Sequence, residues 1–189
     1  MAELIVLGID AGFTATGMCA IDLSQNRVLA SKCIRTQKTS AKRGVRVADD
    51  DAERCATLAR EIAAFLHKTM PQVVVAELPS GGAQGARANR AMGMSTGIVS
   101  AVLALTGYPV EWVTPQAVKK AAAGRRDASK QAVEQSVRQR FQWPDGTMPK
   151  TAVERSHICD AAASVMAAEH GALLAAVRRM ESASGGASE

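Results

Sequence analysis

Residues 4–10, which read LIVLGID, decide the fold class of this chain. Such a run of apolar residues is typical of a strand that is buried on both faces of a sheet, and Asp10 closes it. Residues 73–77 (VVVAE) repeat the pattern and end in Glu77. Two buried strands with a helical pattern between them favour an α/β domain over an all-helical or all-β one.

The rest of the chain alternates between strand and helix patterns. Further strands are predicted at 16–21, 28–34 and 110–113, and helices at 49–69, 86–105, 115–123, 127–141 and 152–180. An initial meander followed by alternating helices and strands predicts an α/β fold with a mixed five-stranded sheet that helices cover on both faces. We expect one domain over residues 1–180 and a flexible polar tail over 181–189.

Length and composition exclude several classes of protein. The 189 residues suffice for one domain, and 47% hydrophobic residues supply its core. Only 3% of residues are aromatic, which argues against a single-strand binder built on rows of stacked rings. No apolar run reaches the ~18 residues of a membrane span and no signal peptide opens the chain, so we expect a cytoplasmic protein without a membrane partner. The four scattered cysteines lack metal-ligand spacing and are expected to be reduced thiols.

Carboxylates stand where the predicted elements end. Asp10 and Glu77 close two buried strands, and open α/β sheets bind their ligands beyond the carboxyl ends of such strands. On the last predicted helix, His157 and Asp160 share one face, beside an apolar stripe. Each residue alone has a structural alternative: a carboxylate that leaves the core, or a hydrogen-bonded core histidine. The aspartates at 49–51 are better explained by a helix start than by metal binding.

Taken together, Asp10, Glu77, His157 and Asp160 form an oxygen-rich set of candidate ligands. Hard carboxylate oxygens favour Mg²⁺ or Mn²⁺. Two such ions, roughly 3.5–4 Å apart, can hold the attacking and leaving oxygens of a phosphodiester. Convergence of the four side chains depends on the fold.

Two basic segments favour a nucleic-acid partner over an ordinary solvated surface. Residues 32–46 hold six basic side chains and no acidic one, and residues 119–150 hold eight basic side chains against three acidic ones. The formal net charge is +5. Neutralising several phosphates in this way gives salt-sensitive affinity that depends little on sequence.

The motifs together resemble the RuvC-type Holliday junction resolvases, whose fold is RNase H-like. Residues 8–17 (GIDAGFTATG) resemble the opening strand and turn of that family, and 74–77 (VVAE) its second acidic strand. Residues 116–119 (QAVK), with Gly124 and Lys130, resemble the region that supplies two functional lysines. Residues 157–163 (HICDAAA) resemble the final acidic helix. The motifs keep the same order from about residue 4 to residue 170.

This resemblance implies a homodimer that cuts two strands of a four-way DNA junction symmetrically and leaves 5′-phosphate and 3′-hydroxyl ends. It implies that Asp10, Glu77, His157 and Asp160 hold two Mg²⁺ ions, for which Mn²⁺ can substitute, and that Lys119 and Lys130 contact phosphates at the cut. Whether His157 is a ligand or a proton carrier stays open, as does whether helix 86–105 forms the dimer face or packs on the sheet. The residues expected to contact DNA are Lys119, Lys120, Arg125, Arg126, Lys130, Phe13, Arg87 and Arg90.

Some features depart from the family pattern. Ala11 stands where the family often has proline, and residues 78–82 (LPSGG) lack the aromatic that some members place near the junction centre. Either Phe13 replaces that aromatic or the wedge is absent. The long basic stretch at 32–46 is compatible with a phage or prophage member.

Three other functions are compatible with parts of the pattern. A nuclease of the same fold that acts on other branched DNA or on structured RNA, as YqgF-type enzymes do, would share the metal ligands. A junction-binding protein without catalysis would bind in Mg²⁺ and not cut. A sugar kinase or actin-like protein would also carry the spacing of Asp10, Gly12 and Thr14, but it closes two lobes over a nucleotide, and this chain is too short for two lobes.

Overall fold

A five-stranded mixed sheet forms the centre of the molecule, in the strand order β3-β2-β1-β4-β5. A computed structural model describes residues 3–39, 44–78 and 85–185. The strands are β1 (Ile5–Asp10), β2 (Ala15–Asp22), β3 (Arg27–Arg35), β4 (Val73–Glu77) and β5 (Val110–Val113). The first three pair antiparallel, while β4 and β5 run parallel to β1. The predicted mixed five-stranded sheet is therefore confirmed.

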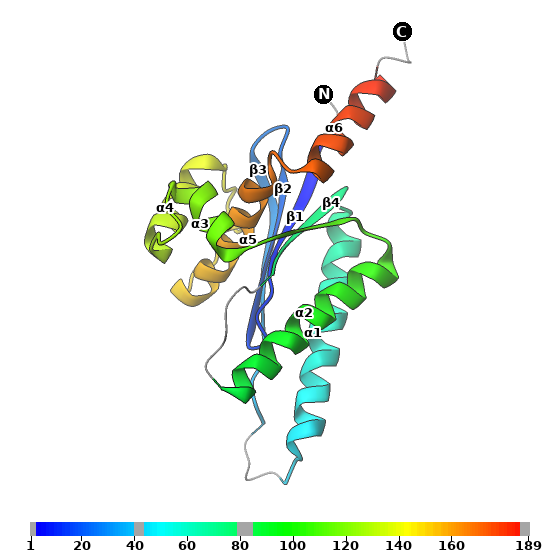
Figure 1. The fold of residues 1–189 in the computed structure, drawn as a ribbon, viewed down its shortest axis with the longest axis vertical. Helices are drawn as coiled ribbons and strands as arrows, with labels where there is room; N and C mark the ends of the chain where they lie inside the picture. Colours follow the sequence, from blue (N-terminus) through cyan, green and yellow to red (C-terminus); the bar gives the residue numbers. More distant parts are fainter. Residues whose placement is uncertain (1–2, 40–43, 79–84, 186–189) are drawn as a thin grey trace.

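Helices cover both faces of this sheet (Figure 1). Helices α1 (Val47–Thr69) and α2 (Ala86–Thr106) pack against each other on one face. Helix α5 (Ala152–Ala168) lies on the other face against β1 and β2, and α3 (Pro115–Ala123) and α4 (Lys130–Arg140) pack on α5. The last helix is α6 (Ala172–Gly185).

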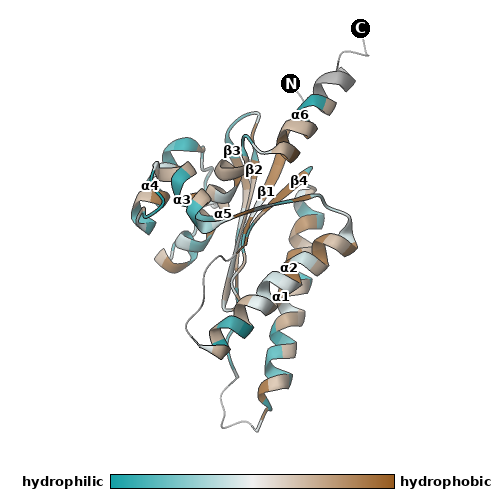
Figure 2. Cartoon of the chain, viewed as in Figure 1, coloured by the Kyte–Doolittle hydropathy of each residue, from teal (hydrophilic) through white to brown (hydrophobic). Residues whose placement is uncertain are grey.

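The strands divide their side chains between two apolar layers. On β1, Leu7 and Ile9 join the layer under α1 and α2, while Val6 joins the layer under α5. All three side chains are fully buried. Figure 2 shows the result, with brown tones along β1 and β4 and much of the teal on α3 and α4.

Two glycines let α5 approach the sheet unusually closely. A Cβ on Gly8 would lie 1.9 Å from the carbonyl oxygen of Ala161, and a Cβ on Gly17 would lie 2.2 Å from that of His157. Only glycine fits at such a distance from a backbone oxygen. Since Gly8 and Gly17 lie on neighbouring strands, they fix α5 at two points along its length.

The C-terminal part of the chain differs from the sequence prediction. One helix was expected over 152–180, but α5 and α6 meet at a bend of 72°. At the bend, Gly171 lies against the carboxylate of Glu111, where a Cβ would lie 1.7 Å from an oxygen. The polar tail expected from residue 181 is helical as far as Gly185, and residues 186–189 lie outside the described part of the chain.

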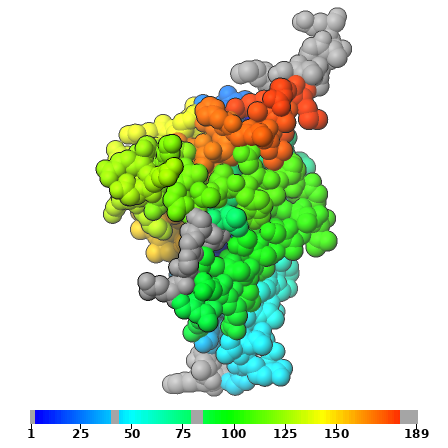
Figure 3. Space-filling model, viewed as in Figure 1, coloured from blue at the N-terminus to red at the C-terminus, as the bar shows by residue number. Residues whose placement is uncertain are grey.

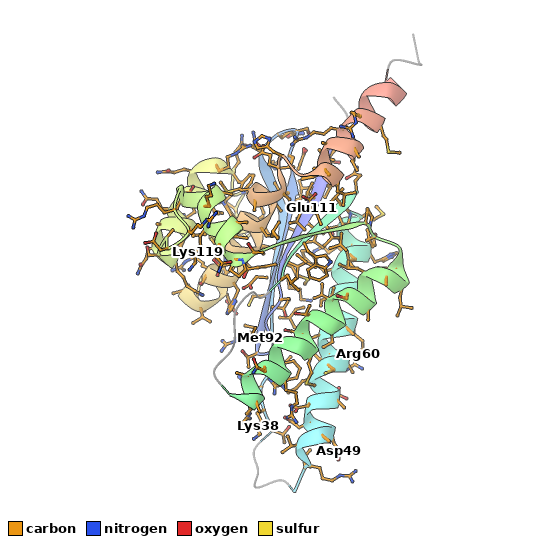
Figure 4. The ribbon with its side chains drawn as sticks, in the orientation of Figure 1. Lys38, Asp49, Arg60, Met92, Glu111 and Lys119 are labelled. Carbon is orange, nitrogen blue, oxygen red and sulfur yellow. The ribbon has the colours of Figure 1, made fainter. Side chains whose placement is uncertain are left out.

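The aspartates at the start of α1 have roles other than capping. Arg46 is the N-cap residue and makes no side-chain cap hydrogen bond. Asp49, at the first turn in Figure 4, pairs with Arg46, whereas Asp50 accepts a hydrogen bond from the amide of Thr39. Asp51 is buried and pairs with arginines.

No single helix within the described ranges is both long and apolar enough to cross a membrane. Helix α5 and the first part of α6 meet the length and composition criteria only when joined, across their bend.

The glycine contacts yield a testable prediction. Gly8→Ala should lower the free energy of unfolding by about 1–3 kcal/mol, because a methyl group must displace the backbone of α5 at Ala161. Urea denaturation followed by circular dichroism measures this change. An unchanged midpoint would show that α5 does not dock on β1 at this distance.

Candidate active site

Asp10 and Glu77 end two neighbouring parallel strands. The β1–β4 register pairs Ile9 with Ala76, so the next residue on each strand is a carboxylate. Both side chains therefore emerge side by side at the carboxyl-terminal edge of the sheet. This arrangement follows directly from the two apolar runs of the sequence.

Helix α5 brings His157 and Asp160 to the same edge. The helix begins after Thr151, whose hydroxyl accepts a hydrogen bond from the amide of Glu154. His157 Nδ1 lies 2.7 Å from Asp10 Oδ2. An ionised carboxylate only accepts hydrogen bonds, so Nδ1 is the donor, and in the neutral imidazole Nε2 then carries the free lone pair.

Two lysines reach the site from the helices that pack on α5. Lys119 lies on α3, which begins at Pro115 after the capping hydroxyl of Thr114. Figure 4 labels Lys119 on the side of the molecule where α3 and α4 lie. Lys130 opens α4, and its Nζ lies 3.1 Å from Ser156 Oγ and 3.5 Å from Asp160 Oδ2.

All six residues predicted to be catalytic line one cavity of about 230 Å³. They are Asp10, Glu77, Lys119, Lys130, His157 and Asp160. Sequence reasoning did not identify the apolar wall formed by Pro115, Val118 and Val133. It also missed Ser156, which holds Lys130, although its position four residues before Asp160 on one helix face signals its place beside the site.

The carboxyl groups in this cavity repel one another. Burial above all, and then the carboxylates of Asp10 and Asp160, raise the pKa of Glu77 from 4.5 to about 7. Lys119 and Lys130 oppose this increase. Burial, followed by Asp10, also raises the pKa of Asp160, against the opposing effect of Lys130.

The chemistry of the donor set suits a divalent cation. The carboxyl groups are clustered and partly buried, so they repel one another, and a cation between them would offset that repulsion. In the described parts of the chain, however, no three His, Cys, Asp or Glu side chains lie close enough to share one ion. Binding a metal to three of them therefore requires side-chain rotation. The His157–Asp10 hydrogen bond must break if both groups bind through the atoms that it joins.

The residues expected to contact DNA differ in their exposure to solvent. Lys120, Arg125 and Arg126 are exposed on or just after α3, and Arg125 pairs with Asp127.

Arg87 and Arg90 are exposed in the first turns of α2, and Arg90 also binds the buried Asp51. Phe13 is only 7% exposed, and the guanidinium of Arg54 lies 4.1 Å from its ring centroid. The ring of Phe13 is thus covered by Arg54, and its contact with DNA stays a prediction.

The model of the crossover junction endodeoxyribonuclease RuvC family matches residues 6–170. This chain belongs to the RuvC family. Among RuvC relatives, the protein of Desulfitobacterium hafniense strain DSM 10664 / DCB-2 is 30% identical over 162 residues, which cover 82% of this chain and 92% of the relative. The protein of Paenarthrobacter aurescens strain TC1 is 31% identical over 136 residues, covering 71% and 67% of the two chains.

Solved structures of RuvC and a related resolvase share the fold. T. thermophilus RuvC in complex with Holliday junction substrate superposes with a TM-score of 0.71 at 24% identity, covering 92% of this chain and 97% of the other. The yeast mitochondrial Holliday junction resolvase Ydc2 gives a TM-score of 0.61 at 16% identity, covering 94% and 83%. The RNase H-like fold is thus confirmed, and membership of the RuvC family excludes the sugar-kinase interpretation.

The raised pKa of Glu77 predicts a stability cost at neutral pH without metal. Because the pKa is higher in the folded state, the contribution of Glu77 to stability is greatest below pH 4.5 and is lost as pH rises through about 7. In EDTA at pH 8, Glu77→Gln should raise the free energy of unfolding by about 3 kcal/mol relative to wild type. The variant should also lack the decrease in the free energy of unfolding that Glu77 causes between pH 4.5 and about 7.

Urea denaturation at a series of pH values measures both effects. Glu53→Gln is the control, because Glu53 forms an exposed ion pair with Arg60, and the loss of that pair should cost less than about 1 kcal/mol. Equal pH profiles for wild type and Glu77→Gln would contradict the repulsion described above.

Proposed function

We propose that this protein is a metal-dependent endonuclease that resolves four-way DNA junctions in the cytoplasm, where it meets cellular or phage DNA. The observation that carries the proposal is the convergence of Asp10, Glu77, His157 and Asp160 from three different elements on one cavity, in a chain of the RuvC family. T. thermophilus RuvC has been solved with a Holliday junction, which supports this substrate class.

We propose that the same four residues hold two Mg²⁺ ions and that Mn²⁺ can replace them. Carboxylate oxygens suit both metals. When bound, these ions lower the pKa of an attacking water and neutralise the departing 3′ oxygen, which leaves 5′-phosphate and 3′-hydroxyl ends.

The other side chains of the cavity have supporting roles in this proposal. His157 Nδ1 orients Asp10, and its Nε2 is available to ligate a metal or to accept a proton. Lys119 and Lys130 reach the cavity as cations and contact the phosphate that is cut. Ser156 holds Lys130 in place through a hydrogen bond of 3.1 Å.

Basic residues outside the cavity supply the longer contact with DNA. Lys120, Arg125 and Arg126 extend the positive surface of α3 away from the lysines of the cavity. Arg87 and Arg90 supply a second positive surface at the start of α2. Such phosphate contacts position a duplex without reading its sequence.

The exposed side of α2 is the proposed dimer face. Gly97, Ser100 and Ala104 are exposed and lie on the helix side opposite the buried Val99 and Val102. A Cβ on Gly97 meets no atom within 4 Å among the described residues. Figure 3 shows α2 (green) at the surface over α1 (cyan). Small side chains let two such helices approach closely, and a dimer would present two active sites for paired cuts.

The function is tested with a synthetic four-way junction beside linear duplex DNA and structured RNA. In Mg²⁺, wild type should place symmetric paired nicks in the junction alone, and EDTA should abolish them. Asp10→Asn should retain junction binding and lose at least about 100-fold in cleavage rate, because a ligand of the metal is lost. Denaturing gels and end labelling measure rates and end chemistry.

Other outcomes of this experiment would select the alternatives. Cleavage of RNA, or of every branched DNA equally, would retain the metal site and reject the junction as the specific substrate. Tight junction binding without cleavage in any divalent metal would make the protein a binding protein.

The proposed dimer face predicts how one charged residue introduced on α2 affects dimerisation. Ala104→Arg should convert the dimer to a monomer in analytical ultracentrifugation and replace paired cuts by single nicks, because two arginines would face each other. Ala64→Arg, on the exposed side of α1, is the matched control and should leave the dimer intact. A dimeric Ala104→Arg variant would place the interface elsewhere.

A further inference from the structure

The turn that follows Asp10 is held at every backbone carbonyl. Residues 11–14 connect β1 to β2. The carbonyl of Ala11 lies 3.2 Å from Ser95 Oγ on α2, which shares its one proton with the carbonyl of Met92 at 3.0 Å. The carbonyl of Gly12 accepts a hydrogen bond of 2.7 Å from Thr16 Oγ1 on β2. The carbonyl of Phe13 accepts one of 2.5 Å from the hydroxyl of Thr36, and the carbonyl of Thr14 accepts one of 3.1 Å from the amide of Thr36. The four donors therefore come from three separate parts of the fold.

These hydroxyl groups are shielded from water. Thr16, Thr36 and Ser95 are 1%, 7% and 2% exposed. Ala11 and Phe13 of the turn are buried, and a buried carbonyl that loses its donor carries a penalty of about 1–3 kcal/mol. The turn conformation is thus strongly favoured over alternatives that leave these carbonyls unpaired.

Arg54 fixes the direction of the hydrogen bonds made by Thr36. Its Nε donates to Thr36 Oγ1 at 3.1 Å, and because arginine is only a donor, the hydroxyl proton of Thr36 is left to point at the carbonyl of Phe13. The guanidinium also lies over the Phe13 ring and forms an ion pair with Asp51. One side chain therefore holds both the ring and, through Thr36, the carbonyl of the same turn residue.

This arrangement is poorly explained by stability alone. Arg54 and Asp51 are 8% and 9% exposed, and burying such a charged pair costs desolvation energy that apolar residues of similar size avoid. What the planar guanidinium provides is fixed geometry, since it places donors at set angles on Thr36 and Asp51.

The carboxylate of Asp10 lies directly before this turn. Asp10 pairs with Gly17 in the β1–β2 ladder, so the ladder holds its backbone on one side and the turn holds it on the other. Its side chain reaches His157 in the cavity described above. A shift of the turn would move Asp10 relative to Glu77 and Asp160, on the other two elements of the site.

We propose that Thr36, supported by Arg54, is a positioning residue for Asp10 that sets the metal affinity and the cleavage rate without touching DNA. This proposal rests on the function proposed above only in taking Asp10 to be a metal ligand. It assigns a role to two residues that lie outside the cavity.

The test compares Thr36→Val, which keeps the shape and removes the hydroxyl, with Thr36→Ser, which keeps the hydroxyl. Thr36→Val should weaken Mn²⁺ binding to the DNA-free protein, measured by electron paramagnetic resonance, by about tenfold. It should also lower the single-turnover cleavage rate at saturating junction by about tenfold and raise the Mg²⁺ concentration for half-maximal rate. The affinity of Thr36→Val for the junction in EDTA should stay within about twofold of the wild-type value. Thr36→Ser should retain wild-type metal binding and cleavage rate.

Two further variants sharpen the comparison. Thr57→Val removes a hydroxyl that donates to the carbonyl of Glu53 within α1, and it should change neither metal binding nor rate. Arg54→Lys keeps the charge but lacks the planar fork, so it should reproduce the Thr36→Val defect.

Several outcomes would overturn the proposal. Wild-type Mn²⁺ affinity in Thr36→Val would do so, as would a Thr36→Ser variant that is equally impaired while still folded by circular dichroism. A loss of junction affinity that accounts for the loss of rate would make Thr36 a DNA-binding determinant instead. If wild-type protein binds Mn²⁺ but cuts no junction, the proposed function fails, and the Mn²⁺ comparison still decides the role of Thr36.

Discussion

The contact of α5 with the sheet at Gly8 and Gly17 is the constraint on which the rest of the structure depends. At these positions, the helix backbone comes closer to β1 and β2 than any side chain would allow. The helix turns that hold His157 and Asp160 are thereby brought to the strand end that holds Asp10. Helices α3 and α4 pack on α5 in turn, so the two lysines of the cavity also depend on this contact.

The fold brings carboxyl groups together in a partly buried cavity, where folded domains ordinarily avoid such groups. Burial and mutual repulsion raise the pKa values of Glu77 and Asp160, so that the carboxylates are held together against their preference. Lys119 and Lys130 offset part of this repulsion. The clustered carboxyl groups therefore lower the free energy of unfolding, and their arrangement suits cations. Such a combination is common at functional sites.

Much of the fold and of the site could be predicted because apolar runs locate strands and a carboxylate marks where each run ends. The positions of Asp10 and Glu77 follow from that pattern, and those of His157 and Asp160 follow from helical spacing. Contacts between distant segments leave no such periodic signal. The sequence therefore does not reveal the Arg54–Thr36 hydrogen bond or the burial of the Phe13 ring beneath Arg54. At the bend before α6, Gly171 lies against Glu111, a contact between distant segments that the helical periodicity does not reveal.

The hydrogen bond between His157 and Asp10 joins residues that are 147 positions apart. During synthesis, the strand that ends in Asp10 is complete long before α5 exists, and a contact of such sequence separation forms late in folding. A chain that ends before α5 has two of the three clustered carboxylates. It lacks His157 and Asp160, and its Lys130 has neither of its α5 partners, Ser156 and Asp160. Unfinished chains, as a consequence, lack the assembled cavity to which cleavage is assigned above, so the proposed nuclease activity begins only after α5 has been made and has docked.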